Sequence, residues 1–257
     1  MAKRVRKEAA EDSPVTAANF VRGRSRAMLE GRVSGAHNKF TAERNALIEW
    51  FERRGAILPR TYCRQFGTVA TGAEHCVFFD LERFCAIKIT HPNRFGHSVY
   101  AEGAHATPLE YLRRLGAHNV LLGDDIRLIG CVLDEEGFQI ISSQPWITTH
   151  PTVPVATEAQ IDALLMEIRF RRSQLFLHGH VFYSSHFNLV IGDAHSGNVL
   201  VSEHGEIVPI DLVIGYPGPA LKAQLRSEFP PDTDSDDTST TLGATPELGM
   251  PSWGDQI

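Results

Sequence analysis

The sequence lacks any long apolar run. No stretch approaches the ~18 to 20 apolar residues that a membrane-spanning helix needs, and the basic start, Met1 to Lys7, is not followed by the apolar segment of a secretory signal. The sequence therefore predicts neither a membrane protein nor a secreted one. We expect a cytoplasmic protein with no membrane partner.

Cysteine is also scarce. The 257 residues contain 4 cysteines, far apart and without a C-x-x-C pair, at Cys63, Cys76, Cys85 and Cys131. This spacing excludes a disulfide scaffold and a cysteine zinc site. We expect reduced thiols.

Charge is distributed unevenly along the chain, although the net charge is only -6. Residues 1–60 carry 13 Lys and Arg against 7 Asp and Glu, whereas residues 226–257 carry 1 against 7. The arginines at 22, 24, 26 and 32 have no aromatic residues between them, so the basic head does not have the pattern of a nucleic-acid interface. The sequence favours no nucleic-acid partner.

The ends of the chain differ in composition from its middle. Residues 1–40 have few large apolar groups, which predicts a basic, flexible segment, either a loose tail or an isolated helix. A capped amphipathic pattern predicts a leading helix over 41–55. The polar and acidic composition of 227–257 predicts a disordered acidic tail.

The middle of the chain alternates between the two regular periodicities. Apolar alternation predicts strands before Gly72 and over 75–80, 84–90, 126–133 and 138–143, and helical spacing predicts helices over 107–115 and 157–172. The order predicts an α+β fold with an antiparallel sheet. Residues 56–147 form its first unit and residues 148–226 its second.

Two acids and one amide gather around a short predicted hairpin. Asp193 is followed five residues later by Asn198, and Asp211 ends the hairpin formed by 199–201 and 207–211. Magnesium prefers oxygen ligands, and phosphoryl transfer needs a positioned metal and one base. We expect Asp193 to be the base and Asn198 and Asp211 to hold Mg²⁺.

At these residues the sequence resembles the protein-kinase-like superfamily, with its D-x-x-x-x-N loop and a metal-binding Asp on the next hairpin. His195 makes the loop similar to the aminoglycoside phosphotransferase branch. Other motifs resemble the kinase domain found in polyvalent proteins of phages and conjugative elements, over about residues 55–215. They are Gly-Ala-Glu-His (72–75), Thr-Pro-Leu-Glu-Tyr-Leu (107–112), Gly-Asp-Asp-Ile-Arg-Leu (123–128), Ser-Gln-Pro-Trp (143–146) and Val-Pro-Ile-Asp (208–211).

The resemblance implies a protein-kinase-like fold, with an antiparallel-sheet N-lobe that has one helix and a truncated C-lobe. It implies that ATP and Mg²⁺ bind between them. Lys88, in Cys85-Ala86-Ile87-Lys88, would contact the phosphates and pair with Glu110 of the following helix. Gly72 would stand in the phosphate loop, and a linker that includes Gln144 and Trp146 would hold adenine. His195 would orient the catalytic loop or touch phosphate.

The sequence also departs from the kinase pattern. Ile191-Gly192 replaces the His-Arg before the catalytic Asp, Leu212 follows Asp211, and the 46 residues after Asp211 leave no room for a peptide-gripping helical platform.

Three functions are consistent with this pattern: transfer of phosphate from ATP to a protein hydroxyl, transfer to a small molecule, and a pseudokinase-like binding module. A fourth interpretation reads His178-Gly179-His180 with Asp193, His195 and Asp211 as a transition-metal hydrolase, but it leaves Lys88 and Glu110 unexplained. The acceptor is not identified by the sequence.

Overall fold

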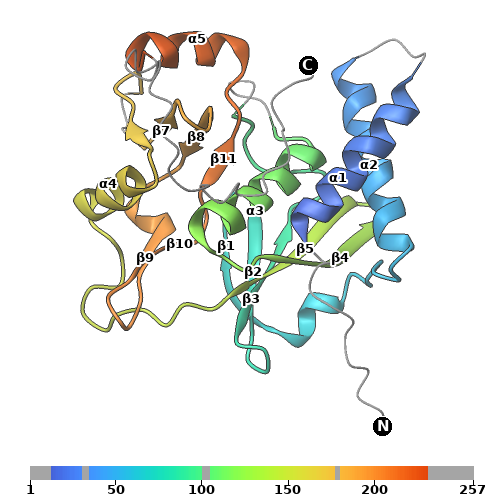
Figure 1. Ribbon diagram of the computed structural model, residues 1–257. Helices are drawn as coiled ribbons and strands as arrows, with labels where there is room; N and C mark the ends of the chain where they lie inside the picture. Colours follow the sequence, from blue (N-terminus) through green and yellow to red (C-terminus); the bar gives the residue numbers. More distant parts are fainter. Residues whose placement is uncertain (1–12, 31–34, 100–104, 177–179, 231–257) are drawn as a thin grey trace, which may run out of the picture.

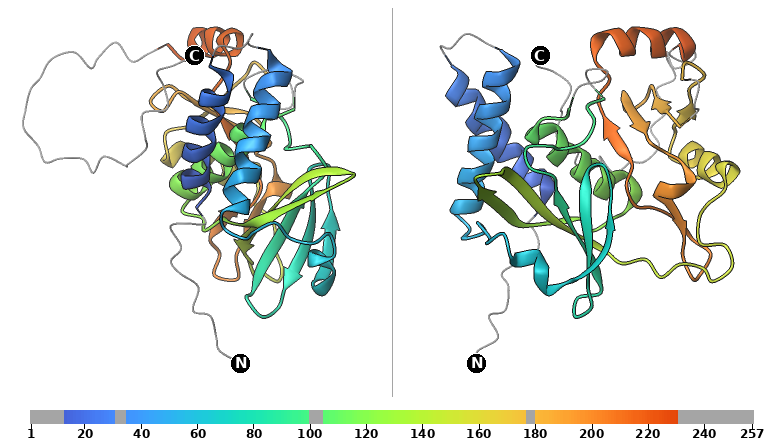
Figure 2. Two further views of the ribbon diagram at one scale, coloured as in Figure 1. Left: turned by 90° about the vertical axis from the view of Figure 1, so that its right-hand side faces the viewer. Right: turned by 180° about the vertical axis from the view of Figure 1, so that it is seen from behind.

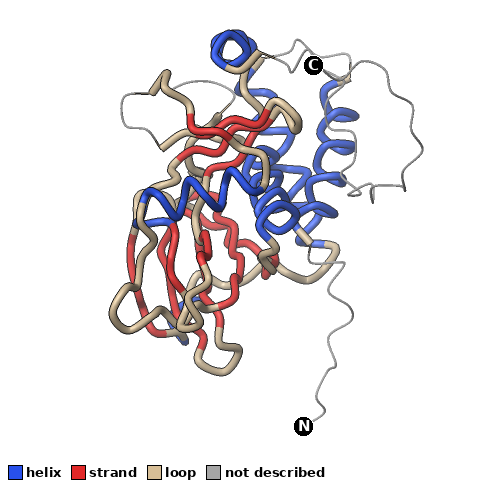
Figure 3. The backbone as a smooth tube through the Cα atoms, turned by 60° about the vertical axis from the view of Figure 1, so that its left-hand side comes forward, coloured by secondary structure: helices blue, strands red, loops and turns tan. Residues whose placement is uncertain are grey.

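The computed structural model describes residues 13–30, 35–99, 105–176 and 180–230. Over these residues the chain has an α+β fold with antiparallel sheets, as predicted. The strands fall into two groups (Figure 3). Most of the predicted acidic tail lies outside the described residues. No helix in the described ranges is long and apolar enough to cross a membrane.

Two helices, α1 (Pro14–Leu29) and α2 (Ala36–Glu52), lie side by side at one flank (Figure 2). The predicted loose tail or isolated helix is wrong for α1, because Ala17 and Val21 are fully buried in the same core as residues of α2 and α3. The α2 helix also begins five residues before the predicted start at 41. The short side chains of α1 allow close helix packing, which composition alone did not reveal.

A five-stranded antiparallel sheet forms the first unit, in the order β1-β2-β3-β5-β4. The β2–β3 hairpin matches the prediction within one residue, and the other strands lie where apolar alternation places them. A short 3-10 helix, Tyr62–Gln65, precedes the sheet. The strands are β1 (Gly67–Thr71), β2 (His75–Asp80), β3 (Cys85–Thr90), β4 (Arg127–Asp134) and β5 (Gly137–Pro145).

One helix, α3 (Pro108–Leu122), lies between the two units (Figure 1). Leu112 packs in the core below the five-stranded sheet, and Ala117 packs in the core of the second unit. The helix ends seven residues beyond the predicted end at 115, where Gly123 adopts a left-handed φ of 69°. Its position makes α3 the structural link between both sides of the molecule.

The second unit combines two small antiparallel sheets with two helices. Its sheets have the orders β11-β8-β7-β6 and β10-β9. The elements are α4 (Glu158–Glu167), β6 (Arg171–Arg172), β7 (Phe182–Ser184), β8 (Leu189–Gly192), a 3-10 turn (Ser196–Asn198), β9 (Val199–Val201), β10 (Ile207–Pro209), β11 (Val213–Gly215) and α5 (Pro219–Glu228).

Two predicted boundaries in this unit are wrong. The helix predicted to reach 172 ends at Glu167, and Arg172 instead pairs back to Glu158 and Asp162 of α4. The chain expected to be disordered from 227 is still ordered at Phe229, which is 8% exposed, and the carboxylate of Glu228 accepts hydrogen bonds from 173 and 174. At both places, tertiary ion pairs and the burial of side chains outweigh the local preference that the sequence pattern indicates.

Candidate active site

A cavity of about 720 Å³ opens between the five-stranded sheet and the second unit. Its walls come from the turn before β2, from the segment between β3 and α3, and from the ends of β8 and β10. Four of the predicted site residues line it: Gly72, Asp193, Asn198 and Asp211. The fold therefore brings together residues that lie up to 139 positions apart in the sequence.

Asp193 follows β8 in the left-handed backbone region, with φ 59°, which is uncommon for a residue other than glycine. The side-chain amide of Asn198 donates to its carboxylate at 2.8 Å and to its backbone carbonyl at 2.9 Å. These bonds fix the carboxylate at the cavity wall. Strained backbone of this kind is often found at functional sites.

His195 lies beside Oδ1 of the Asp193 carboxylate, whereas Asn198 bonds to Oδ2. Its Nδ1 accepts the backbone N–H of Gly197 at 3.0 Å, so the proton of the neutral ring is on Nε2. Nε2 lies 3.2 Å from Asp193 Oδ1. Each oxygen of the Asp193 carboxylate thus faces one donor, and the carboxylate is held in a defined orientation.

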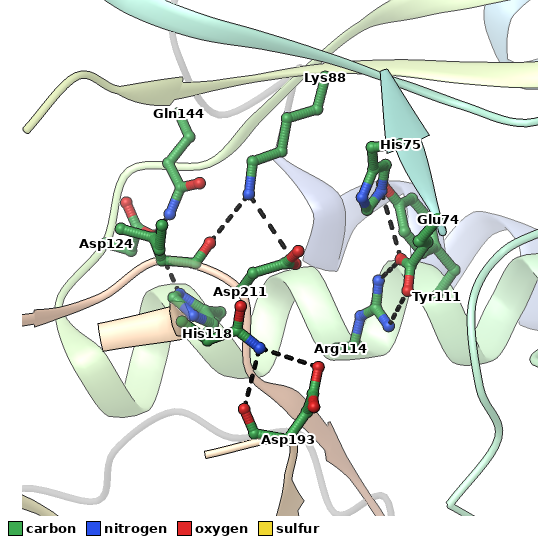
Figure 4. Close-up of polar contacts among 12 residues, drawn as sticks. Glu74, His75, Lys88, Tyr111, Arg114, His118, Asp124, Gln144, Asp193 and Asp211 are labelled. Carbon is green, nitrogen blue, oxygen red and sulfur yellow. Dashed lines mark hydrogen bonds and ion pairs between the residues drawn. The ribbon is translucent and has the colours of Figure 1, made fainter. Parts of the chain in front are cut away.

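The backbone of Ile210 joins three of the site residues. Its carbonyl accepts a hydrogen bond from Lys88 Nζ at 2.9 Å, and its N–H donates to the carbonyl of Asn198 at 2.9 Å. Lys88 Nζ also lies 3.9 Å from Asp211 Oδ1 (Figure 4). A lysine within the central strand β3 of the first unit therefore contacts the backbone that follows the β9–β10 hairpin of the second unit.

Asp211 lies among basic side chains, of which Lys88 and Arg114 carry charge at neutral pH. Burial alone would raise its pKa, but Lys88, His75 and Arg114 favour the charged carboxylate, and the net effect is a pKa below the usual value of 3.8. The side chain is 42% exposed, so its oxygens still reach the cavity. The group is ionised at neutral pH and open to a ligand.

One known family has a model that matches most of the chain. Residues 41–216 match the family described as the serine/threonine/tyrosine kinase found in polyvalent proteins. The chain belongs to this kinase family. No curated protein matches the sequence. The match covers the cavity and every predicted site residue, and it confirms the resemblance drawn from the motifs.

Glu110 does not pair with Lys88 in this kinase-family chain. Its carboxylate accepts the backbone N–H of Thr107 at 3.0 Å, and the Thr107 hydroxyl accepts the N–H of Glu110, a capping box at the start of α3. The hydrogen bonds and ion pairs of Lys88 within the described residues go to Ile210 and Asp211 instead. Glu110 therefore stabilises the helix end and lies outside the cavity.

A different ion pair joins α3 to the turn at Gly72. The guanidinium of Arg114, which is 5% exposed, makes two hydrogen bonds to the Glu74 carboxylate, one of them at 3.0 Å (Figure 4). Burial lowers the pKa of Arg114, although the group stays charged. The pair fixes the turn before β2 against α3. Sequence reasoning missed it, although Tyr111, Arg114 and His118 share one helix face beside the apolar stripe.

His75, the first residue of β2, is neutral in this site. It is 3% exposed, and burial lowers its pKa to about 4. Its Nε2 lies 2.9 Å from the Tyr111 hydroxyl. The neutral ring lies beside the Glu74 carboxylate, so the histidine adds a hydrogen-bonding group but no charge at neutral pH.

The linker residues lie beside the cavity rather than in its walls. Gln144 continues β5 and its amide donates to Asp124, whose pKa is lowered because the His118 ring and two N–H donors outweigh the effect of burial. Gln144 lines a small adjoining space of about 10 Å³ with Lys88 and Asp211. The Trp146 ring packs on Phe79, with centroids 4.6 Å apart.

The alternative metal site is only partly covered by the structure. His178 and Gly179 lie outside the described residues, while the His180 ring lies edge-on to His195, with centroids 5.6 Å apart. Among the described residues, no group of three or more His, Cys, Asp and Glu could hold a metal ion. The hydrolase interpretation therefore receives no support from the described side chains.

Proposed function

We propose that this chain is an ATP- and Mg²⁺-dependent kinase that transfers phosphate to a hydroxyl group of a protein. The observation that carries the proposal is the junction at Ile210, where Lys88 meets Asn198 and Asp211 at the edge of the cavity that Asp193 lines. On this proposal the five-stranded sheet with α3 is the N-lobe, and residues 148–226 are a truncated C-lobe.

The donor set at the cavity fits Mg²⁺. Asn198 uses its N–H groups on Asp193, and its Oδ1 accepts no hydrogen bond from a described residue. That amide oxygen and the ionised Asp211 carboxylate are the hard oxygen ligands that Mg²⁺ prefers. Bound there, Mg²⁺ would neutralise charge on the ATP phosphates.

Asp193 is placed to act as the base. Held by Asn198 and His195, its carboxylate would accept the proton of the acceptor hydroxyl as that oxygen bonds to the γ-phosphorus and ADP leaves. Lys88 would contribute positive charge beside the phosphates. The Gly72 turn would cover them, since Gly72 lines the same cavity.

A small-molecule acceptor is the second candidate. The specific observation in its favour is the contact of His195 with Asp193, because the D-x-H-x-x-N loop resembles small-molecule phosphotransferases. Both candidates need the same nucleotide site and the same base. They differ only in the phosphate acceptor that enters the cavity.

Transfer of labelled phosphate from [γ-³²P]ATP tests the proposal. The assay uses pooled protein substrates, pooled Ser, Thr and Tyr peptides and an aminoglycoside panel. We expect labelling of a protein or peptide that is lost with EDTA and abolished by Asp193→Asn but retained by Asp125→Asn, an exposed carboxylate outside the cavity. Labelling of aminoglycosides alone would favour the second candidate. Nucleotide binding without any transfer would favour a pseudokinase.

A further inference from the structure

Residues 94, 96, 97 and 105, which lie between β3 and α3, form a cavity wall that the proposed catalysis leaves unused. Arg94, His97 and His105 line the same cavity as Asp193 and Asp211. Lys88 does not line this cavity; it borders the small adjoining space with Asp211. The cavity thus has a second set of cationic and N–H donor groups that is separate from the lysine.

Backbone and core contacts hold this wall in place. His91 Nε2 lies 2.9 Å from the carbonyl of Gly72, and the N–H of Asn93 donates to Phe138 at 2.9 Å. Between Arg94 and Gly96, the Phe95 side chain is fully buried and packs beside Phe138. This wall is therefore attached both to the turn at Gly72 and to the hydrophobic core.

The two histidines are fixed as a pair. The strand-like pairing of His97 with His105 brings their rings to a centroid distance of 6.5 Å with an interplanar angle of 22°. The N–H of Ala106 also donates to the carbonyl of Gly96 at 2.9 Å. An imidazole has at least one N–H donor in either protonation state, so this pair offers donors at any pH.

The charge of Arg94 is uncompensated. Its guanidinium has no ion pair or hydrogen bond with any described residue, whereas the Glu74 carboxylate is matched by Arg114. Asp193 is bonded to His195 and Asn198, and Asp211 faces Lys88. The wall therefore presents a permanently charged, planar donor group with no internal partner, which suits a phosphate or carboxylate.

We propose that Arg94, His97 and His105 form a subsite for an anionic group that the protein acceptor carries near its hydroxyl, an acidic or phosphorylated side chain. This inference rests on the proposed kinase function for the identity of the ligand. The other source of the same chemistry is the terminal phosphate of ATP, which the experiment separates from the acceptor.

The first arm uses nucleotides. Calorimetric titrations compare Mg²⁺·ADP with Mg²⁺ and a non-hydrolysable ATP analogue, on wild type, Arg94→Ala and Arg64→Ala. Arg64 is an exposed arginine on the 3-10 helix before β1 and serves as the matched control. We expect the three proteins to have the same affinity for each nucleotide. A tenfold loss confined to the ATP analogue in Arg94→Ala would overturn the acceptor subsite and assign Arg94 to the terminal phosphate.

The second arm uses phosphoserine as the probe, at constant ionic strength, on the full chain with and without Mg²⁺·ADP. Wild type and Arg64→Ala should bind it, and Arg94→Ala should bind about tenfold or more weakly, because charge-assisted hydrogen bonds to the guanidinium are lost. His97→Ala should weaken it in the same direction. No binding by folded wild type, or binding that Arg94→Ala leaves unchanged, would overturn the subsite.

The two proposals fail separately. If phosphoserine binds through Arg94 but neither nucleotide binds, the anion subsite stands and the kinase proposal fails. If nucleotides bind through Lys88 but phosphoserine does not bind, the nucleotide site of the kinase proposal stands and the subsite fails.

Discussion

Lys88 Nζ donates a 2.9 Å hydrogen bond to the backbone carbonyl of Ile210, which is 122 positions away in the sequence. Because Ile210 immediately precedes Asp211, this bond places the lysine beside the carboxylate that we assign to the metal. In this chain the lysine bonds to the backbone that follows β10 and not to a glutamate of α3. Because Glu110 of α3 does not pair with the lysine, we expect a substitution of Glu110 to affect the helix and not the lysine.

Glu110 is expected to affect helix stability and not nucleotide binding. Glu110→Gln keeps the capping box and should leave both properties unchanged, whereas Glu110→Ala should lower the free energy of unfolding by about 0.5 to 1 kcal/mol. Urea unfolding and nucleotide titration measure the two effects. Loss of nucleotide affinity in the well-folded Glu110→Gln variant would show that Glu110 acts at the site.

The contributions of Glu74 and Arg114 to the stability of the fold are expected to depend on one another. Glu74→Ala leaves a buried, unpaired guanidinium and should destabilise the fold by about 3 kcal/mol or more. The double variant Glu74→Gln with Arg114→Met removes both charges and should recover much of that loss. Urea unfolding of wild type, the single variants Glu74→Gln and Arg114→Met and this double variant gives the coupling energy, and strict additivity would contradict the pairing.

Gly96 is required because the ion pair packs directly on its Cα. Its φ is +78°, and an added Cβ would lie 1.9 Å from Glu74 Oε2. Gly96→Ala should therefore destabilise the fold by more than about 1 kcal/mol. Gly205→Ala is the control, since Gly205 has a φ of +83° but nothing within 4 Å of the added Cβ. Equal decreases of the melting temperature in the two variants would show that the contact of residue 96 with the Glu74–Arg114 ion pair does not contribute to stability.

His75 is expected to make stability depend on pH. Its pKa falls from 6.5 to about 4 on folding, so below pH 6.5 the unfolded chain binds a proton that the native chain does not. Stability should therefore fall as the pH is lowered from 6.5 towards 4, and this residue alone should contribute a loss of about 2 kcal/mol between pH 7 and pH 5.

The control for this pH effect is His75→Gln, which keeps a polar side chain next to the Tyr111 hydroxyl and has no ring to protonate. Its urea midpoint should change less between pH 7 and pH 5 than that of wild type. Identical pH dependence in the two proteins would show that His75 is not the responsible group.

The sequence predicted the elements whose periodicity is strong, and it predicted that candidate site residues close to one another in the chain lie together in space. The β2–β3 hairpin and the trio Asp193, Asn198 and Asp211 are examples, because local spacing determines their positions. The partner of Lys88 was not predictable in this way. Glu110 belongs to the first turn of α3 and Glu74 contacts Arg114 of the same helix, and the sequence does not say which group each one meets.

One local bond and tertiary packing decided the remaining differences. The Thr-x-x-Glu spacing at 107–110 is a capping-box pattern, and that local bond engages Glu110 at the start of α3. The buried alanines of α1, by contrast, show their role only once α2 and α3 are in place. Burial against distant elements is not contained in a local pattern.

Calorimetric titration with a non-hydrolysable ATP analogue, with and without Mg²⁺, tests the central claim most directly. Wild type, Lys88→Ala and Asp211→Asn are compared, with Lys222→Ala, a lysine of α5 outside the cavity, as the control. We predict Mg²⁺-dependent binding by wild type and Lys222→Ala, loss of affinity in Lys88→Ala, and loss of the Mg²⁺ dependence in Asp211→Asn. No nucleotide binding by folded wild type, or equal binding by all four proteins, would contradict the proposed site.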